Sequence, residues 1–510
     1  MVKNKNIQKD IIVISDLHLS EGIDKDTGKI SRNEDFFFDN EFSNFIDYLI
    51  VQKDKSFNLI INGDFFDFLQ VIITDKNKPI KKNKHYELKI NDKVFKLRES
   101  EKEFGLGTDE EKSALKMRVI AEGHRKFFKA LYKFLINGNT LSIIKGNHDV
   151  ELYWNGVKEE FKNQIVMAGL NKKEKNVKNI RNNKRKLEEE HIKDIKKRIN
   201  FYPWIYYDSG IYIEHGNQYE KINSFEYFLN PTLPKPNDNR IYLPLGSYFV
   251  RYFFNKIEVI SPFVDNIKPV TNYISWVIKN KIFHFFKIIV KYTLLLFKVL
   301  KKDRDFNEEK MKEIKDIDDY RLNKISKEFN LEIIKLRKIY DMKETPIIKN
   351  KFELLKLMYR DLSLGFMFVV LSGILFYYLW SYFELLRPLF ILFILIIFYY
   401  LPSIINSIMS PYKSNKNYLR DKAKNIYKNL DDKVENIVFG HTHNPDIFKI
   451  SDRCYYYNTG TWTPLFIEEE RVLKQNIQFP FLYISNGKKP ELLNWNNNTG
   501  EPEPLKLFEE

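Results

Sequence analysis

Cysteine is nearly absent from this 510-residue sequence, which contains a single thiol, Cys454. One cysteine excludes a disulfide within the chain and is typical of proteins in a reducing compartment. We expect Cys454 to be a small residue in a strand. The first ten residues are polar and rich in lysine, so the apolar core of a secretory signal peptide is also missing. The sequence therefore predicts a protein without disulfides and without a signal peptide.

Acidic residues are outnumbered by basic ones. The chain has 83 Lys and Arg against 68 Asp and Glu, a formal net charge of +15. Such a balance favours an anionic partner, and nucleic acid, acidic lipid and a phosphorylated substrate all fit it. The length exceeds that of one ordinary domain, so we expect two or three structural units. No internal repeat and no Pro- or Ser-rich linker separates them.

Histidine is scarce as well, and its placement is informative. Five of the nine histidines lie in short motifs, and each motif follows a strand-like apolar run such as residues 11–14. In chain order the motifs are Asp16-Leu17-His18, Gly63-Asp64-Phe65-Phe66-Asp67, Gly146-Asn147-His148-Asp149, His215-Gly216 and Gly440-His441-Thr442-His443. Oxygen and imidazole ligands gathered at strand ends are what a divalent-metal hydrolytic site needs.

The spacing within the motifs suits metal binding. Alternate residues of an extended segment point to the same side, so Asp16 and His18 can reach one ion, and so can the two histidines of the last motif. Asp64 has two carboxylate oxygens, enough to bridge two cations. Asn147 offers a neutral oxygen, which limits the negative charge of the site. We expect these side chains to meet beyond the C-terminal edge of a sheet, the usual ligand crevice of α/β folds.

The five motifs, in this order, resemble those of the calcineurin-like metallophosphoesterase family: D-x-H, G-D-x-x-D, G-N-H-[DE], H-G and G-H-x-H. The resemblance covers residues 8–222 and 431–490. It implies an α/β fold, a layered β-sandwich flanked by helices. Residues 15–19 and 440–445 are similar to the UDP-2,3-diacylglucosamine hydrolase branch, whose members cleave a pyrophosphate bond in a lipid precursor at the membrane surface. The chain departs from that branch in its much longer insert.

The resemblance also implies a site with two divalent metal ions. One ion would be held by Asp16, His18 and His443. The other would be held by Asn147, His215 and His441, with Asp64 between the two ions. Mn²⁺ is favoured on the resemblance, while Fe and Zn²⁺ suit the same ligands.

Catalytic roles follow from the same resemblance. His148 would sit over the phosphoryl group and assist at the leaving oxygen, and Asp149 would polarise His148. Three further polar residues could support the ligands from behind, namely Asp67, Glu214 and Asn217. For Asp67 a purely structural hydrogen bond is an equal alternative. His124 is expected to have a packing role, with substrate contact as the alternative.

The interval between the last two motifs is long, 226 positions from His215 to His441 (441 minus 215). It contains two uncharged 22-residue spans, residues 362–383 and 388–409. Since about 20 apolar residues cross a bilayer as a helix, we expect a transmembrane hairpin; two buried helices are the alternative. Lysine and arginine flank both ends, which predicts a cell-membrane protein with two spans and a cytoplasmic catalytic domain.

These features predict four regions. Residues 1–222 and 411–510 would form the two parts of the metallophosphoesterase domain, residues 223–360 a helical insert, and residues 361–410 the transmembrane hairpin. Within the insert, 279–302 is expected to lie in the membrane interface, with a helix packed on the protein as the alternative. Residues 303–350 should form a charged helical pair.

The first region alternates strand and helix patterns, as expected for an α/β domain. We expect strands at 11–15, 58–62 and 141–145 and helices at 40–53 and 110–136, with an irregular surface segment at 71–108. The charge run 171–198 predicts a solvated helix, and a polyanion-binding arm is the alternative.

Together these features predict a membrane-anchored, two-metal phosphoesterase. Its substrate would contain a phosphodiester or pyrophosphate bond, in a lipid-linked or nucleotide-diphospho compound. Alternatives are a membrane-tethered nuclease, a cyclic-nucleotide phosphodiesterase or a protein phosphatase, so nucleic acid stays among the candidate partners beside the lipid bilayer. A non-catalytic scaffold is the remote alternative, because every motif histidine is intact.

Overall fold

The computed structural model covers the regions around all five motifs. It describes residues 9–507 except for the ranges 25–26, 32, 53–54, 74–79, 83–84, 91–92, 171–181, 237, 253–254, 256–306, 350–416, 431–432, 470–471 and 486–487. The predicted hairpin (362–409) and interfacial segment (279–302) lie outside the described residues. Within the described ranges, no helix is both long enough and apolar enough to cross a bilayer.

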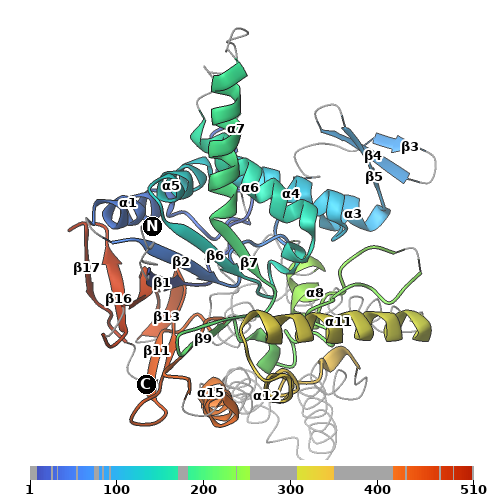
Figure 1. Ribbon diagram of the computed structural model, residues 1–510. Coiled ribbons are helices and arrows are strands. Elements are labelled where there is room, and N and C mark those ends of the chain that lie inside the picture. Colours follow the sequence, from blue (N-terminus) through green and yellow to red (C-terminus); the bar gives the residue numbers. More distant parts are fainter. Residues whose placement is uncertain are drawn as a thin grey trace, which may run out of the picture.

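The larger of two stacked sheets has seven strands in the order β17-β16-β15-β1-β2-β6-β7 (Figure 1). Its central strands β1, β2, β6 and β7 run parallel, while β15, β16 and β17 add an antiparallel edge beside β1. The strands are β1 (Asp10–Ile14), β2 (Phe57–Asn62), β6 (Thr140–Ile144), β7 (Ile199–Tyr202), β15 (Pro480–Ile484), β16 (Glu491–Asn496) and β17 (Glu501–Pro504). The strands predicted at 11–15, 58–62 and 141–145 are thus confirmed.

The second sheet joins segments that are far apart in the sequence. Its order is β11-β12-β10-β9-β8, and its strands are β8 (Ile205–Asp208), β9 (Ile211–Glu214), β10 (Asn436–Phe439), β11 (Asp446–Lys449) and β12 (Tyr455–Asn458). β9 and β10 pair in parallel, with Ile211 opposite Asn436. This pairing places the loop after β10, which carries the fifth motif, beside the loop after β9, which carries the fourth. A separate hairpin, β13 (Leu465–Glu469) and β14 (Val472–Asn476), follows.

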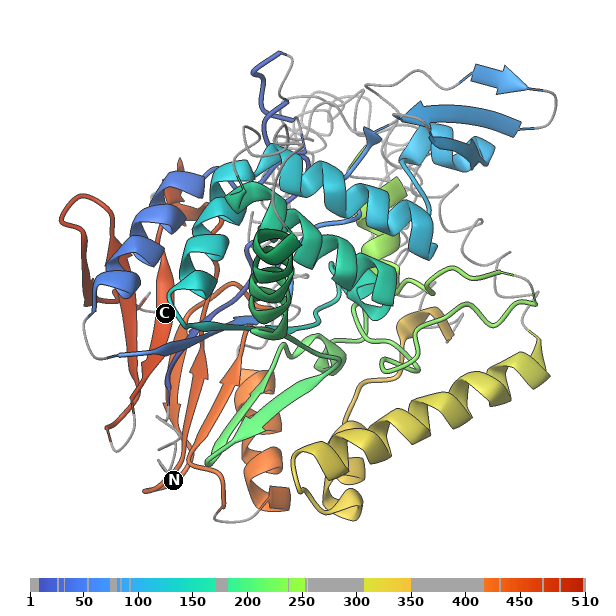
Figure 2. The ribbon, with the colours of Figure 1, turned by 45° about the horizontal axis from the view of Figure 1, so that its top comes forward.

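Both faces of β1 are buried, because the strand lies between two apolar layers. Ile12 and Ile14 face a core shared with helices, whereas Ile11 and Val13 face the second sheet. This alternation follows from the two-residue period of a strand. The helix layer consists of α1 (Asp39–Val51), α4 (Glu110–Gly123), α5 (Arg125–Ile136) and α6 (Asn155–Gly169), and Figure 2 shows these helices on one side of the larger sheet. The expected layered sandwich flanked by helices is therefore present.

The predicted helix at 110–136 is interrupted at His124. α4 ends at Gly123 and α5 begins at Arg125, because His124 has φ −108° and ψ 40°, outside the helical region. Tertiary contacts cause the break. His124 is bound by Glu34 and Asp39, and Gly123 lies so close to the Glu21 carbonyl that a Cβ would come within 1.9 Å of it. The helix predicted at 40–53 is confirmed by α1.

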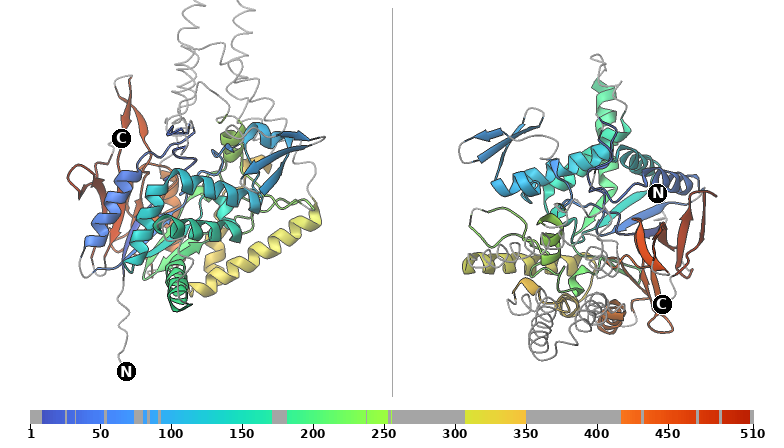
Figure 3. Two further views of the ribbon diagram at one scale, coloured as in Figure 1. Left: turned by 90° about the horizontal axis from the view of Figure 1, so that it is seen from above. Right: turned by 180° about the vertical axis from the view of Figure 1, so that it is seen from behind.

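Residues 71–108 are more ordered than predicted. They contain a three-stranded antiparallel sheet, β3 (Ile80–Lys82), β4 (His85–Ile90) and β5 (Lys93–Leu97), and helix α3 (Glu99–Phe104). The charge run forms helix α7 (Asn182–Lys197), as predicted for its second half, while 171–181 lies outside the described residues. Figures 1 and 3 show that α7 and the β3–β5 sheet project from the body of the molecule.

The described part of the insert packs on the outer face of the second sheet. It comprises α8 (Leu245–Tyr252), α11 (Glu308–Glu328) and α12 (Ile333–Tyr340), so the predicted helical pair at 303–350 is confirmed. Leu322 and Ile339 share a core with Phe439 of β10. α15 (Asn417–Leu430), which precedes β10, completes this layer.

Candidate metal centre

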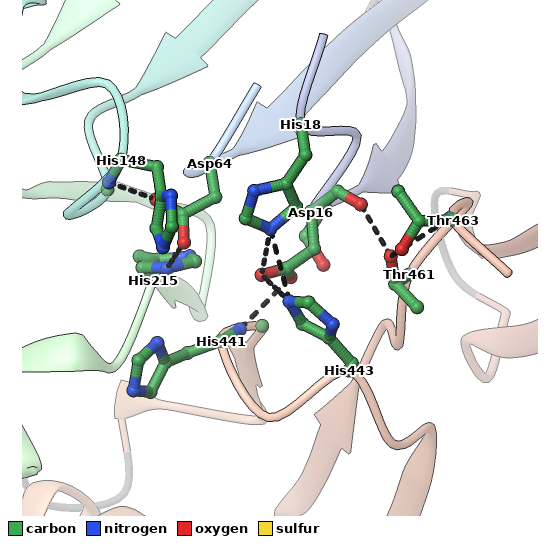
Figure 4. A network of polar contacts seen from close by, with 12 residues as sticks. Asp16, His18, Asp64, His148, His215, His441, His443, Thr461 and Thr463 are labelled. Atoms are coloured by element: carbon green, nitrogen blue, oxygen red, sulfur yellow. Dashed lines mark hydrogen bonds and ion pairs between the residues drawn. The ribbon is translucent and has the colours of Figure 1, made fainter. Parts of the chain in front are cut away.

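The five motif loops converge at one edge of the two sheets. Each follows directly on a strand, namely β1, β2, β6, β9 or β10. Because these strands run parallel within their sheets, their C-terminal ends open to the same side. Figure 4 shows side chains from all five loops pointing toward one another. Three groups of potential ligand atoms lie there within 4.8 Å of one another: Asp16, His18 and His443; Asp64, His215 and His441; and His18, Asp67 and His148.

Backbone strain is concentrated in this site. Among the described residues, seven that are not glycine have positive φ, and five of them are Asp16, His18, Asp64, His441 and His443. A left-handed conformation costs an ordinary residue about 1–3 kcal/mol and persists only where the surroundings hold it. These loops therefore keep their ligands in strained positions that aim each side chain at a common point.

The first group has the spacing of ligands around one ion. Nε2 of His18 lies 3.1 Å from Nε2 of His443, and the latter lies 3.4 Å from Oδ1 of Asp16. Two atoms that are each about 2.1 Å from an ion are about 3.0–3.4 Å apart at ordinary coordination angles. All three residues are buried.

The second group is built around Asp64. Its Oδ2 lies 3.0 Å from Nε2 of His215, and the His215 and His441 rings meet edge to face with centroids 5.2 Å apart. Nδ1 of His215 is 2.9 Å from the Asn62 carbonyl, which leaves Nε2 directed at Asp64. Asp64 therefore lies against the His215 and His441 side of the site.

At two motif positions only glycine fits, because a neighbouring ligand side chain lies too close for a Cβ. A Cβ on Gly146 would lie 2.2 Å from Oδ1 of Asp64, and a Cβ on Gly63 would lie 2.3 Å from the ring of His215. Side chains at these positions would push the ligands away from the centre.

His148 is oriented by Asp67 rather than by Asp149. Nδ1 of His148 lies 2.6 Å from Oδ2 of Asp67, and the same oxygen is 3.7 Å from Nδ1 of His18. Asp149 accepts instead from the amides of Gly146, at 2.6 Å, and Phe65, at 2.9 Å. It therefore joins the loops that carry Asp64 and Asn147, and the role expected for it at His148 falls to Asp67.

Glu214 and Asn217 lie behind the site. Oε2 of Glu214 accepts from Trp204 Nε1 at 2.7 Å and from the Tyr212 hydroxyl at 3.1 Å. Asn217 donates to the carbonyl of Asn223 at 3.1 Å. Both residues are buried, and these hydrogen bonds support the loop that carries His215.

Two residues of the segment after the last motif support the site. Thr461 donates to the Asp16 carbonyl at 2.6 Å, and Asn458 donates to the Gly440 carbonyl at 2.8 Å. Through this segment they hold the first and fifth loops together. Trp462 is a core residue whose Nε1 donates to Pro480. His124 is also structural, because Glu34 and Asp39 surround it.

The polar atoms of the cluster suit divalent cations. Oδ1 of Asn147 and Oδ1 of Asp16 are buried, yet neither has a hydrogen-bond partner in the described part of the chain. Unsatisfied buried acceptors are rare, and coordination of a cation is one way to satisfy them. The donors are carboxylates, an amide and imidazoles without a thiolate, which fits Mn²⁺, Fe or Zn²⁺.

Opposite charges shift the pKa values of the cluster. Burial alone would raise the pKa of Asp16, but the His215 and His443 rings lower it to about 2. Burial would lower the pKa of His215, yet Asp64 and Asp16 raise it to about 9. For Asp149, burial and the charge of Asp64 both act upward and raise the pKa to about 7. The first two shifts show how closely carboxylates and imidazoles are packed in this cluster.

Comparison with known proteins agrees with this geometry. Residues 9–247 match the family model of the calcineurin-like phosphoesterases. The chain thus carries a calcineurin-like phosphoesterase domain, the family that the five motifs predicted, and this family implies a metal-dependent phosphoesterase. The match extends to the family and not to the UDP-2,3-diacylglucosamine hydrolase branch. No curated protein and no solved structure matches the chain. His441 and His443 lie beyond the matched range, and the β9–β10 pairing joins them to it.

Proposed function

We propose that this protein is a membrane-anchored two-metal phosphoesterase that hydrolyses a phosphodiester or pyrophosphate bond. The observation that carries the proposal is the convergence of six of the expected ligand side chains from four separate loops at one sheet edge, where His148 of the remaining motif loop joins them. Two bound divalent cations, with Mn²⁺ as the favoured metal, would supply an activated water and neutralise charge on phosphoryl oxygens.

The chain's own residues would bind and orient the reactants. Asp16, His18 and His443 would hold one ion. Asn147, His215 and His441 would hold the other, and Asp64 would lie between them. All of these residues except the half-buried His441 are buried, which strengthens their electrostatic interactions.

His148 is placed to move a proton. Nδ1 of His148 lies against the Asp67 carboxylate, which accepts the Nδ1–H. The His148 side chain keeps 13% of its surface exposed, while Asp67 is fully buried. In its protonated form, with both ring nitrogens carrying a hydrogen, His148 would donate the Nε2 proton to the departing oxygen and be left as the neutral Nδ1–H tautomer.

A lipid-linked or nucleotide-diphospho substrate is the favoured class. The support comes from the sequence: the uncharged spans 362–383 and 388–409 are long enough to hold the enzyme at a bilayer, and the net charge of +15 suits an anionic substrate. Placement of the catalytic domain on the cytoplasmic side belongs to the same proposal.

The first test is Mn²⁺-dependent hydrolysis of bis-p-nitrophenyl phosphate in mild detergent. We expect activity that is lost on chelation and reduced about 10²–10⁴-fold in His148→Ala. His191→Ala is the matched control, because His191 is an exposed histidine of α7. Wild-type protein that binds no metal would refute the proposal.

Substrate class and anchoring have separate tests. A lipid pyrophosphate should be cleaved faster than DNA, a cyclic nucleotide or a phosphoprotein; preference for one of the latter three would select the corresponding alternative. Full-length protein should stay with membranes after alkaline carbonate washing, whereas a variant lacking 362–409 should be released. Release of the full-length chain would refute the anchor.

A further inference from the structure

Glu220 contacts a ligand histidine although it belongs to none of the five motifs. Its Oε2 lies 2.7 Å from Nε2 of His441. The contact is partly buried, with 7% of the His441 side chain and 43% of the Glu220 side chain exposed. Glu220 follows the short 3-10 turn Asn217–Tyr219, five positions after His215.

The contact parallels one that the other histidine of this group makes. His215 uses Nδ1 to reach the Asn62 carbonyl at 2.9 Å, which leaves Nε2 for the metal side. A metal-bound histidine ordinarily donates its second ring N–H to a carboxylate or a carbonyl, and this fixes its tautomer and ring orientation. For His441 the occupied nitrogen is Nε2, so Nδ1 is the atom left for an ion. Figure 4 shows the His441 ring beside His215.

Glu220 is itself held in place. The side-chain amide of Asn223 donates to the same Oε2 at 2.8 Å, and the amides of Asn223 and Ser224 donate to the Glu220 carbonyl at 3.0 and 2.9 Å. One donor therefore holds the carboxylate and two hold the backbone of Glu220, so the acceptor needs little reorganisation to meet His441.

The insert contributes to this support. The amide of Glu344 donates to the Gln218 carbonyl at 2.8 Å, and the amide of Ile347 donates to the Lys221 carbonyl at 3.1 Å. Both donors come from the segment after α12. The turn that carries Glu220 is therefore fastened on both sides by the insert.

We propose that Glu220 is a positioning residue of the second metal site, which accepts the Nε2–H of His441 and thereby presents Nδ1 to the ion. The inference rests on the proposed two-metal function. Glu220 would thus be a residue of the site that lies outside the family motifs. The affinity for one of the two ions would depend on the turn that carries Glu220 and that the insert supports.

The test measures metal affinity and not activity. Mn²⁺ binding to the chelator-stripped full-length protein is followed by calorimetry in detergent, for wild type and Glu220→Gln. We expect two ions in the wild type and, in the variant, an affinity lowered about 10–100-fold for one ion only. Glu220→Asp, which keeps a carboxylate, should lose less Mn²⁺ affinity than Glu220→Gln. Glu226→Gln, a carboxylate of the same segment that pairs with Lys349 at 2.8 Å, should leave both affinities unchanged.

A double variant tests whether Glu220 acts through His441. Glu220→Gln added to His441→Ala should weaken Mn²⁺ binding no further than His441→Ala alone. Additive losses would overturn the proposal, as would Glu220→Gln with both affinities within twofold of wild type. A wild type that binds no ion would instead refute the two-metal function itself. Thermal melting of each variant shows whether the fold is intact.

Discussion

Individual residues of the site are more strained than their identities reveal. Aspartate and histidine at positive φ have no signature in a sequence, yet five ligands adopt that conformation. The motif glycines were visible, and the contacts at Gly63 and Gly146 explain them. Which motif side chains gather at the site could therefore be predicted from residue type and spacing. The hydrogen-bond partner of His148 could not be predicted, because Asp67 and Asp149 both lie in the motifs near it. Only the folded loops show that Asp67 is the partner.

Asp67→Asn should lower turnover without removing the metal. Loss of the carboxylate leaves Nδ1 of His148 with a weaker acceptor, so the ring is less well oriented. We expect kcat with bis-p-nitrophenyl phosphate to fall about 10–100-fold, with KM little changed. Asp47→Asn, at an exposed pair with Lys133, is the control. Unchanged kcat in Asp67→Asn, beside a large loss in His148→Ala, would show that this hydrogen bond is dispensable.

His124→Phe should destabilise the fold in a pH-dependent way. Burial opposes the charged ring, but Glu34 and Asp39 raise the pKa of His124 to about 10. A raised pKa stabilises the fold fully below the ordinary value near 6.5, and this contribution is lost as pH rises through about 10. Because the variant leaves buried carboxylates without their cation, we expect a loss of about 3 kcal/mol near pH 6.

The measurement for His124 is the melting temperature from pH 6 to pH 10. The gap between wild type and His124→Phe should narrow as the pH rises. His191→Phe, at an exposed position of α7, should melt like the wild type throughout. A gap that is constant with pH would mean that His124 is held as a neutral ring.

At the scale of elements, periodicity predicted the strands before the motifs and the helix at 40–53. It failed where tertiary contacts override it. The pattern of residues 110–136 is continuous, but the packing of Gly123 on Glu21 and the anchoring of His124 divide it into α4 and α5. Residues 85–90 (His-Tyr-Glu-Leu-Lys-Ile) alternate strictly between polar and apolar, which is a strand signal, so the prediction of an irregular segment at 71–108 was wrong on local grounds. Only the break at His124 depends on contacts between segments distant in sequence, which one sequence does not show.

Gly146→Ala should disable the site through a contact between two elements. The added Cβ would lie 2.2 Å from Oδ1 of Asp64, so the loop after β6 would displace the Asp64 carboxylate. We expect Mn²⁺ affinity, measured by calorimetry, to fall by at least about tenfold. This corresponds to a loss of about 1.4 kcal/mol of binding free energy.

Gly138→Ala is the matched control for the loop change. Gly138 has φ +86°, and its Cβ would meet nothing within 4 Å. This variant should lose about 1–2 kcal/mol of stability from backbone strain and keep its metal affinity. Equal metal affinities in the two variants would contradict the crowding argument.

Across the whole molecule, the site depends on contacts between the two ends of the chain. β1 pairs with β15, and β9 pairs with β10, so ligands from residue 16 to residue 443 meet at one edge. The order of the motifs predicted this meeting. The insert also supports the site: Lys145, next to the third motif, donates to the Phe228 carbonyl at 2.6 Å. This contact could not be predicted, because a charge pattern does not specify which carbonyl a lysine reaches.

Asp318→Ala should loosen the loop of the insert whose Phe228 carbonyl accepts from Lys145 beside the site. Oδ1 of Asp318 accepts from the amides of Leu229 and Asn230 at 2.8 and 3.0 Å, and its Oδ2 accepts from the Tyr340 hydroxyl. The variant leaves these buried groups unpaired, at a cost of about 1–3 kcal/mol each. We expect a lower melting temperature and faster hydrogen exchange in peptides covering 225–230.

Asp319→Ala separates this effect from a general loss of charge on α11. Asp319 is the next residue and pairs with Arg337 at 2.7 Å, with 35% of its side chain exposed, so its removal should cost no more than about 1 kcal/mol. Exchange at 225–230 should stay at the wild-type rate. If both variants melt and exchange alike, α11 does not hold this loop, and the insert affects the metal centre only through the turn that carries Glu220.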